Sequence, residues 1–99
     1  MRTIDEKAYN AFMNGERFIG KNTKVIIASN ETVCMYLFDN MIACKQRGQI
    51  EICSGGYKPS RTTRSRLSMF VNISLHKGKF IINNKIKWDG EWTNINHFN

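Results

Sequence analysis

The stretch that decides the fold is "TVCMYLFDNMIACKQRGQIEIC", residues 32–53. It holds three short runs of apolar or alternating residues, at 32–38, 41–46 and 49–53. The pairs Asp39-Asn40 and Arg47-Gly48 separate these runs, and both pairs are typical of tight turns. Turns this short connect antiparallel neighbours only. Together with the β-branched run "TKVIIAS" at 23–29 on their N-terminal side, these runs predict an antiparallel β-meander of three or four strands.

A helix is expected before the meander, at about residues 3–14. Thr3 can cap its first turn, which carries two acidic residues at the end where the helix dipole favours negative charge. Apolar residues recur at four-residue spacing from Ile4 to Phe12, so one face of this helix is apolar. Gly15 is a suitable stop.

A second helix and a hairpin are expected after the meander. Thr62 or Thr63 can cap a helix at about 62–71, with apolar residues at 67, 70 and 71 facing inward. The runs "NISLHK" and "KFIINN" meet at Lys77-Gly78, a hairpin signal, and "KIKW" at 85–88 adds a short strand. No repeat or linker interrupts the chain. The sequence therefore predicts one α+β domain, residues 1–99, with an N-terminal helix, a meander, a second helix and a C-terminal β-hairpin.

The net charge of +7 is concentrated in one segment. Residues 1–53 have a net charge of +1, and residues 89–99 have −2. Residues 54–88 hold eight Lys and Arg and no acidic residue. Such clustering favours a polyanionic partner, because a charge that served solubility alone would be spread more evenly. The alternative is a solvated basic face without a ligand.

The remaining composition bears on location and chemistry. The segment "MRTIDEKAYN" has no apolar signal region, and no apolar run approaches the length that spans a bilayer, so we expect no membrane association. The odd cysteine count, Cys34, Cys44 and Cys53, indicates free thiols in a reducing cytosol.

Catalytic patterns are missing from the sequence. Neither His76 nor His97 has a nucleophile or carboxylate in a recognised arrangement beside it. The cysteines do not form the two close pairs that a zinc knuckle needs. We therefore expect a non-enzymatic protein without metal or cofactor.

The segment 54–66, "SGGYKPSRTTRSR", has the composition of an anion site. A glycine loop lets the backbone approach a ligand, a helix start presents free N–H groups, and arginines bind phosphate in a forked geometry. The candidate ligand-binding residues are Gly56, Tyr57, Lys58, Arg61, Thr62, Thr63, Arg64 and Arg66. The alternative is an ordinary capped amphipathic helix with solvated arginines.

Helix geometry limits which of these side chains converge. Arg61 and Arg64 are three residues apart and can share a face, and Lys58 can reach them from the loop. Arg66 is two residues from Arg64 and points elsewhere, so it carries less weight. Tyr57 beside the arginines suits base stacking, whereas Trp88 and Trp92 are interpreted as core or core-edge residues.

Parts of residues 35–90 also carry a family resemblance. The string "YLFDN-IA" at 36–43, "SGGY" at 54–57 and "TTRSRL" at 62–67, followed by an aromatic hairpin, are similar to a pattern in small proteins of bacteriophages and other mobile elements. Gly55, Tyr57 and Ser68 stand where that pattern usually has asparagine, tryptophan and asparagine. The resemblance implies a protein that acts in the cytoplasm of an infected bacterium, and it implies no particular activity.

Three functions follow as hypotheses. The first is a phage protein that antagonises host defence by sequestering a phosphate-bearing nucleotide. The second is DNA or RNA binding through the basic segment, and the third is an inhibitor that docks on an acidic patch of a host defence protein. A homo-oligomer is compatible with each, because a small meander leaves edge strands.

Overall fold

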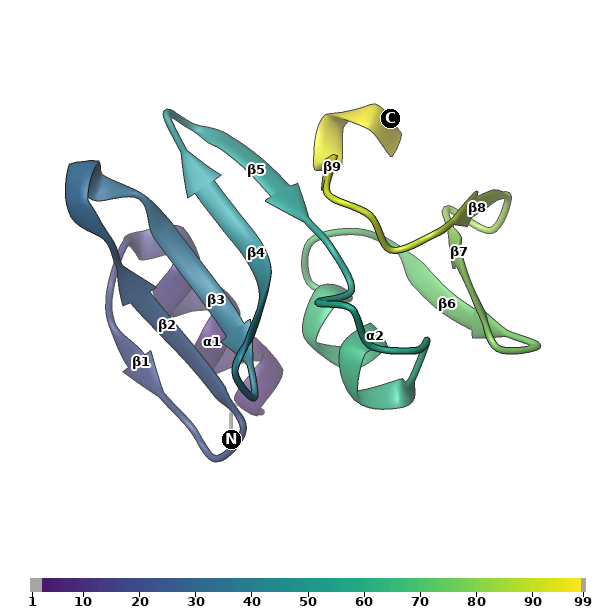
Figure 1. Cartoon of the computed structure of the whole chain (residues 1–99), viewed down its shortest axis with the longest axis horizontal. Coiled ribbons are helices and arrows are strands. Elements are labelled where there is room, and N and C mark those ends of the chain that lie inside the picture. Colours follow the sequence, from purple (N-terminus) through teal and green to yellow (C-terminus); the bar gives the residue numbers. More distant parts are fainter. Residues whose placement is uncertain (1–2, 99) are drawn as a thin grey trace.

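The computed structural model describes residues 3–98 and has the α+β architecture expected from the sequence (Figure 1). Its helices are α1 (Ile4–Asn14) and α2 (Arg61–Leu67), with 3₁₀ turns at Ser29–Glu31 and Ile95–Phe98. Its strands are β1 (Phe18–Ile19), β2 (Thr23–Ile27), β3 (Val33–Leu37), β4 (Asn40–Gln46), β5 (Gln49–Ile52), β6 (Ile73–His76), β7 (Lys79–Ile82), β8 (Ile86–Trp88) and β9 (Thr93–Asn94).

The expected meander forms the larger of two antiparallel sheets. Its strand order is β1-β2-β3-β4-β5-β9, so the first five strands follow one another along the chain. The strand β9 then returns from the C-terminal segment and pairs with β5, with Ile52 opposite Thr93. This return places the C-terminal segment against the first sheet and was not expected from the sequence.

The two turns inside the meander differ in how well the sequence locates them. Arg47 and Gly48 form the β4–β5 turn as expected, with φ of 54° and 76°. The β3–β4 turn lies one residue earlier than expected, because Leu37 pairs with Asn40 and leaves Phe38 in the turn. The Phe38 N–H donates to the Asn22 carbonyl at 2.6 Å, and this bond holds the residue at a positive φ of 55°. A register shift after Met35 absorbs the one-residue difference.

The smaller sheet, β6-β7-β8, contains the expected C-terminal hairpin. Lys77 and Gly78 form its turn with φ of 50° and 75°, the left-handed values that a tight hairpin turn requires. The register places Phe80 between Leu75 and Trp88 on one face, which turns toward the core. The run "KIKW" supplies the third strand, as expected.

The helix α1 has the cap and the stop that the sequence indicates. The Thr3 hydroxyl accepts a hydrogen bond from the Glu6 N–H at 3.3 Å, and Gly15 ends the helix at φ 68°. The buried face consists of Ala8, Ala11 and Phe12, and it packs against β2 and β3. Among residues 3–98, neither helix has the length and apolar character needed to cross a bilayer.

The helix α2 is shorter than expected and has a different cap. It starts at Arg61 and ends at Leu67, whereas the sequence indicated 62–71 with Thr62 or Thr63 as the cap. Ser60 is the actual cap, because its hydroxyl accepts from the Thr63 N–H at 3.2 Å. The N–H of Phe70 then bonds to the Leu67 carbonyl, which closes a turn. Leu67 belongs to the hydrophobic cluster shared by both sheets.

Candidate phosphate-binding face

Arg66 is the only basic residue of α2 that the structure buries, with 8% of its surface exposed. Its guanidinium donates to Asp5 of α1 at 2.5 Å, to the Thr23 hydroxyl at 2.6 Å and to the Asn22 side chain at 2.9 Å. Ser65 also donates to the Asp5 carboxylate. This network joins α2 to α1 and to the start of β2, so Arg66 is occupied by the protein itself.

Arg61 and Arg64 lie on the opposite side of α2 and line an open hollow of about 640 Å³. The other wall is the β6–β7 hairpin, which contributes Ser74, Leu75 and the Lys77-Gly78 turn. The expectation that Arg61 and Arg64 share a face agrees with this placement. Lys77 joins them from the hairpin and was not among the candidate residues.

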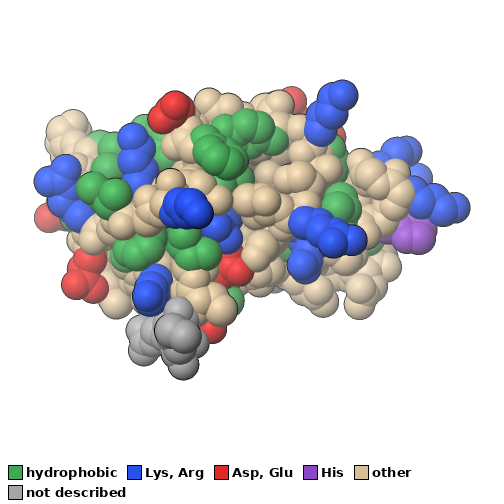
Figure 2. Space-filling view, turned by 90° about the horizontal axis from the view of Figure 1, so that it is seen from below, with side chains coloured by type: hydrophobic (Ala, Val, Ile, Leu, Met, Phe, Trp, Pro, Cys, Tyr) green, Lys and Arg blue, Asp and Glu red, His purple; other side chains and the backbone are tan. Residues whose placement is uncertain are grey.

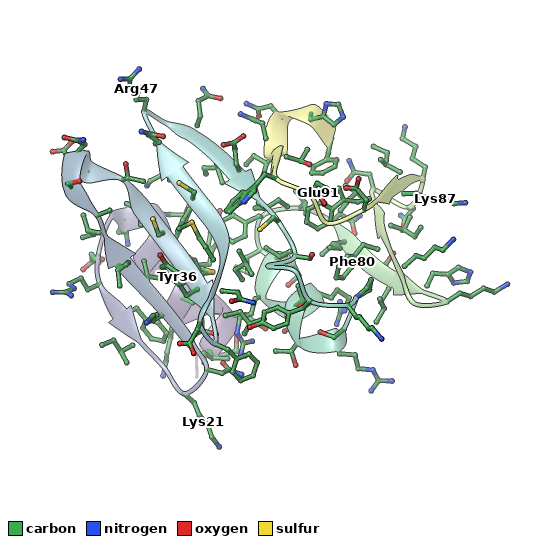
Figure 3. All side chains as sticks on the ribbon, in the orientation of Figure 1. Lys21, Tyr36, Arg47, Phe80, Lys87 and Glu91 are labelled. Carbon is green, nitrogen blue, oxygen red and sulfur yellow. The ribbon has the colours of Figure 1, made fainter. Side chains whose placement is uncertain are left out.

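The basic surface continues from this hollow onto the small sheet. The register places Ser74, Ile81 and Lys87 side by side on the outer face, and His76 opposite Lys79. Lys79 and Lys87 are exposed, and Figure 3 shows Lys87 pointing away from the molecule. Several Lys and Arg side chains stand at the right-hand end of the molecule in Figure 2, where this sheet lies. We call Arg61, Arg64, Lys77, Lys79 and Lys87 the basic face.

The charges of the basic face are not neutralised within the described part of the chain. Among residues 3–98, the one pair of oppositely charged side chains within 4 Å is Arg66 with Asp5. The segment 54–88 contains no acidic residue that could serve the others. Unpaired cations in a cluster repel one another, and a bound anion relieves that repulsion.

The other candidate residues lie away from the hollow. The Tyr57 hydroxyl donates to the Leu37 carbonyl at 3.0 Å, and its ring packs edge-on against Phe38 at 6.2 Å. Gly56 and Lys58 are exposed on the same loop, and neither lines the hollow. Thr62 is exposed, whereas Thr63 is 1% exposed and accepts from the Ser60 hydroxyl. The structure therefore separates the tyrosine from the arginines.

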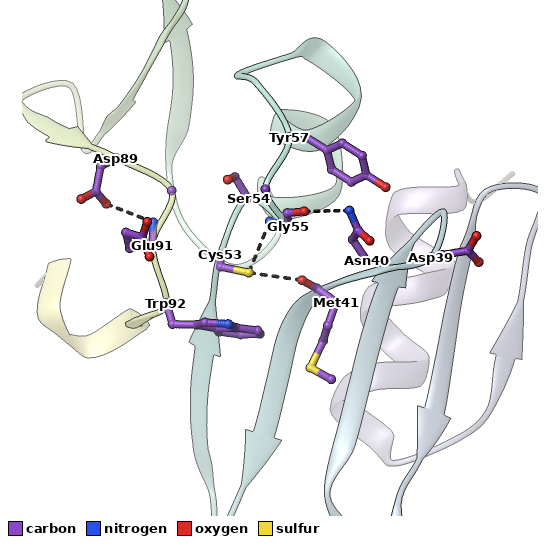
Figure 4. Close-up of a pocket in the computed structure, with 12 residues that line it drawn as sticks. Asp39, Asn40, Met41, Cys53, Ser54, Gly55, Tyr57, Asp89, Glu91 and Trp92 are labelled. Carbon is purple, nitrogen blue, oxygen red and sulfur yellow. Dashed lines mark hydrogen bonds between the residues drawn. The ribbon is translucent and has the colours of Figure 1, made fainter.

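A second hollow, of about 680 Å³, is acidic and was missed by the sequence analysis. Three loops line it: residues 39–41, residues 53–57 and residues 89–92 (Figure 4). They bring Asp39, Asp89 and Glu91 to one cavity, together with Tyr57 and Trp92. The sequence does show that the acidic segment "DGEW" at 89–92 follows 35 residues without an acidic side chain. No local pattern indicates that this segment lies close to Asp39 in the fold.

The cysteines are free in the structure, and Cys34 lies opposite Cys44 on β3 and β4. Burial raises the pKa of the Cys34 thiol, and Cys44 adds to the shift. Burial also raises the pKa of Cys53, while the Gly55 N–H acts against the shift and Glu91 adds to it. Within residues 3–98, no three His, Cys, Asp or Glu side chains are grouped as metal ligands.

Comparison with known proteins gives one match. The sequence profile of the Kyanoviridae Gp96 protein family matches residues 1–98, which is nearly the whole chain. No curated protein and no solved structure matches the chain. The expected phage origin is confirmed at the level of the family, while the motif pattern over 35–90 stays an interpretation. Since the match covers far more than half of its length, the chain belongs to the Kyanoviridae Gp96 family of phage proteins.

Proposed function

We propose that this phage protein is a non-enzymatic nucleic-acid-binding protein that holds phosphate groups on its basic face. The observation that carries the proposal is the set of unpaired cations that α2 and the small sheet present together. Arg61, Arg64 and Lys77 meet at one hollow, and Lys79 and Lys87 extend it along the sheet. A string of cations on an open surface suits a string of phosphates, because each contact releases counterions from the polyanion.

The position of Tyr57 favours nucleic acid over a single nucleotide. A nucleotide site needs a surface for the base beside the phosphate site. The tyrosine expected to supply that surface packs against Phe38, and its hydroxyl is held by Leu37. The hollow of the basic face is lined by Leu75 as its only apolar side chain. The sequestration of a nucleotide immune signal therefore becomes the competing hypothesis.

The phage origin gives the proposal its setting. A phage protein that binds nucleic acid would act in the cytoplasm of the infected bacterium, on phage or host DNA or RNA. An antagonism of host defence is compatible with that setting and stays a prediction.

The test is fluorescence anisotropy with labelled duplex DNA and with single-stranded DNA and RNA, over a range of salt concentrations. If the face neutralises about four phosphates of a duplex, the log–log slope is near −3.6, which is a loss of about 150-fold between 50 and 200 mM salt. Arg61→Ala with Arg64→Ala removes two contacts and should reduce the slope by about 1.8.

The matched control is Arg17→Ala with Lys21→Ala, which removes the same charge from exposed positions on the other side of the fold. Lys21 points into solvent at the edge of the larger sheet (Figure 3). This control should bind almost as the wild type does. Equal losses in both double variants would mean that only net charge matters, and no binding to any nucleic acid would refute the proposal. A nucleotide that binds by calorimetry while nucleic acids do not would favour the competing hypothesis.

A further inference from the structure

The larger sheet has one face that the rest of the described chain leaves uncovered. The helix α1 packs against β2 and β3 from behind in Figure 1, and within residues 3–98 no helix or strand lies in front of these two strands. Antiparallel sheets commonly turn polar side chains toward water on such a face. The side chains on this face therefore indicate whether it is suited to water or to a partner.

The strand register shows which side chains stand on the uncovered face. Lys45 donates to a backbone carbonyl of α1 at 2.7 Å, so its row of the sheet faces the helix. Side chains alternate along a strand, so the next row, in which Cys34 lies opposite Cys44, points away from the helix. Ile26 and Glu51 complete this row on β2 and β5.

A second row stands beside the first on the same face. Ile19, Lys24, Tyr36 and Met41 lie opposite one another in turn on β1, β2, β3 and β4. The Lys24 ammonium lies 5.4 Å from the centre of the Tyr36 ring, which agrees with their common side. Met41 shares the lining of the acidic hollow with Trp92, which is 45% exposed. We call these two rows, together with Trp92, the open face.

The open face is apolar over most of its extent. All its side chains other than Lys24 and Glu51 belong to hydrophobic residue types, and Ile19 is 82% exposed. Cys34 is only 5% exposed, so its neighbours close over it and the surface is continuous. A continuous apolar patch with polar residues at its rim marks an interaction site in a soluble protein.

The two charges of the open face indicate which partner fits. Lys24 stands on β2 and Glu51 on β5, on opposite sides of the apolar residues. Neither takes part in an ion pair within the described part of the chain. With one charge of each sign, the open face complements neither a polyanion nor a polycation. A second copy of the same face, however, presents a carboxylate for the lysine and an ammonium for the glutamate.

Two-fold symmetry brings these charges together. An axis that runs along the strands, between β3 and β4, places β2 of one copy over β5 of the other. Lys24 of each copy then lies near Glu51 of its partner, displaced by one row, or about 7 Å along the strands, which two long side chains can bridge. Two sheets stacked in this way bury their apolar faces against each other, as the sheets of a β-sandwich do.

We propose that the open face is a dimer interface on which a second copy of this chain docks face to face, with two Lys24–Glu51 pairs at the rim. Five strands about 4.8 Å apart, each with about five residues, give a face of about 400 Å². This is about half of the roughly 800 Å² per partner in a standard interface, so we expect a reversible dimer. The open face shares no residue with the basic face, and the inference does not depend on nucleic-acid binding.

The test is sedimentation velocity of the full chain in reducing buffer over a wide range of protein concentration. The wild type should shift reversibly from monomer to dimer as the concentration rises. Ile26→Lys places an unpaired charge in the apolar part of the interface and should weaken the dimer at least about 10-fold. The matched control is Ile27→Lys, because the neighbouring residue is 43% exposed and points to the opposite side of the sheet. This control should dimerise as the wild type does.

Charge reversal tests whether the partner is a second copy. Lys24→Glu and Glu51→Lys each place like charges across the interface, and each should weaken the dimer by about 10-fold. The variant with both changes restores the two pairs with their signs exchanged, so it should dimerise nearly as the wild type does. Within one copy the two residues are three strands, or about 14 Å, apart, so such a rescue must act between copies.

A measurement on the unmodified protein covers the case in which a variant fails to fold. The half-buried Cys44 thiol lies on the open face and should react more slowly with N-ethylmaleimide as the protein concentration rises. Peptide mass spectrometry follows this rate, with Cys53, outside the two rows, as the control. A monomer at every concentration, or no rescue in a folded double variant, would overturn the proposal. So would a bacterial protein that binds the monomer and is released by Ile26→Lys, because the open face would then dock a different partner.

Discussion

The two sides of α2 show one residue type in two different roles. Arg66 is 8% exposed and bonds to Asp5, Asn22 and Thr23, whereas Arg64, two residues earlier, faces an open hollow without a carboxylate partner. The side that faces the larger sheet is a structural joint, and the side that faces the small sheet is available to a ligand. An arginine therefore indicates a phosphate site only after its protein partners have been found.

The two hollows extend the same comparison to the whole molecule. The basic hollow has a helix for one wall and an open hairpin turn for the other, and the space around Gly78 is empty. In the acidic hollow, hydrogen bonds join the three lining loops to one another, and the space beside Gly90 is filled by Ser54. A basic surface of this kind suits a long polyanion of variable sequence.

The largest expected effect is the loss of the Arg66 joint. Arg66→Ala leaves Asp5 part-buried and removes three donated hydrogen bonds, so the free energy of unfolding should fall by about 3–5 kcal/mol. Arg64→Ala should change it by less than about 0.5 kcal/mol, because the residue is partly exposed and unpaired. Urea denaturation of both variants is the measurement. Equal stabilities for the two would contradict the separation of the two sides of α2.

A smaller effect is expected where the walls of the two hollows differ. Gly90→Ala combines a positive φ of 85° with a clash against Ser54, and should cost at least about 2 kcal/mol of unfolding free energy. Gly78→Ala has a similar φ of 75° with no atom nearby, so it should cost only about 1–2 kcal/mol. Thermal and urea unfolding measure the stability of both glycine variants.

A double variant separates the clash from the backbone strain. Ser54→Gly should restore part of the stability lost in Gly90→Ala, because it removes both side-chain atoms that the new Cβ would meet. It should restore nothing in Gly78→Ala. An additive result in both backgrounds would mean that the acidic hollow is no more tightly packed at Gly90 than the basic hollow is at Gly78.

Much of the fold was predictable because its signals are local. Turn pairs such as Arg47-Gly48 and Lys77-Gly78 lie next to the strands that they join, and Thr3 lies next to the helix that it caps. The burial of Arg66 was not predictable, because its partner Asp5 is 61 residues away in the sequence. Phe38 took a turn position that a propensity scale disfavours, since its N–H bonds to a carbonyl of another loop.

The candidate site was predictable in part for the same reason. The helical spacing of Arg61 and Arg64 is a local property, and both line the hollow. Lys77 lines that hollow from a hairpin turn, whereas Tyr57 lies away from it and packs against Phe38. Neither placement was predictable, because each depends on how elements distant in the sequence pack together. The acidic hollow is lined by three loops that are more than ten residues apart in the sequence, so no local pattern predicts it.

The smallest expected effect concerns the pH dependence of stability at the acidic hollow. Burial raises the pKa of Cys53 above the ordinary value of 9.0, and Glu91 adds to the shift. Below pH 9 the thiol is protonated in the folded and the unfolded chain, so its contribution to stability is complete. As the pH rises past 9, the unfolded chain loses its proton first, so stability falls until the folded thiol also titrates. Burial also raises the pKa of Cys34, so the same loss of stability is expected from that thiol, and a Cys34 variant must be measured beside the Cys53 variant.

The measurement is urea unfolding in reducing buffer at pH 8 and at pH 10 for the wild type, Cys53→Ala, Cys34→Ala and Glu91→Gln. The alanine variants should lose less stability between the two pH values than the wild type does, because each removes one group with a raised pKa. Glu91→Gln should reduce the loss slightly, because it removes one cause of the Cys53 shift and leaves Cys34 untouched. If Glu91→Gln changed nothing while Cys53→Ala did, burial and the Gly55 N–H would set the Cys53 pKa, and the carboxylate of Glu91 would have no part in it.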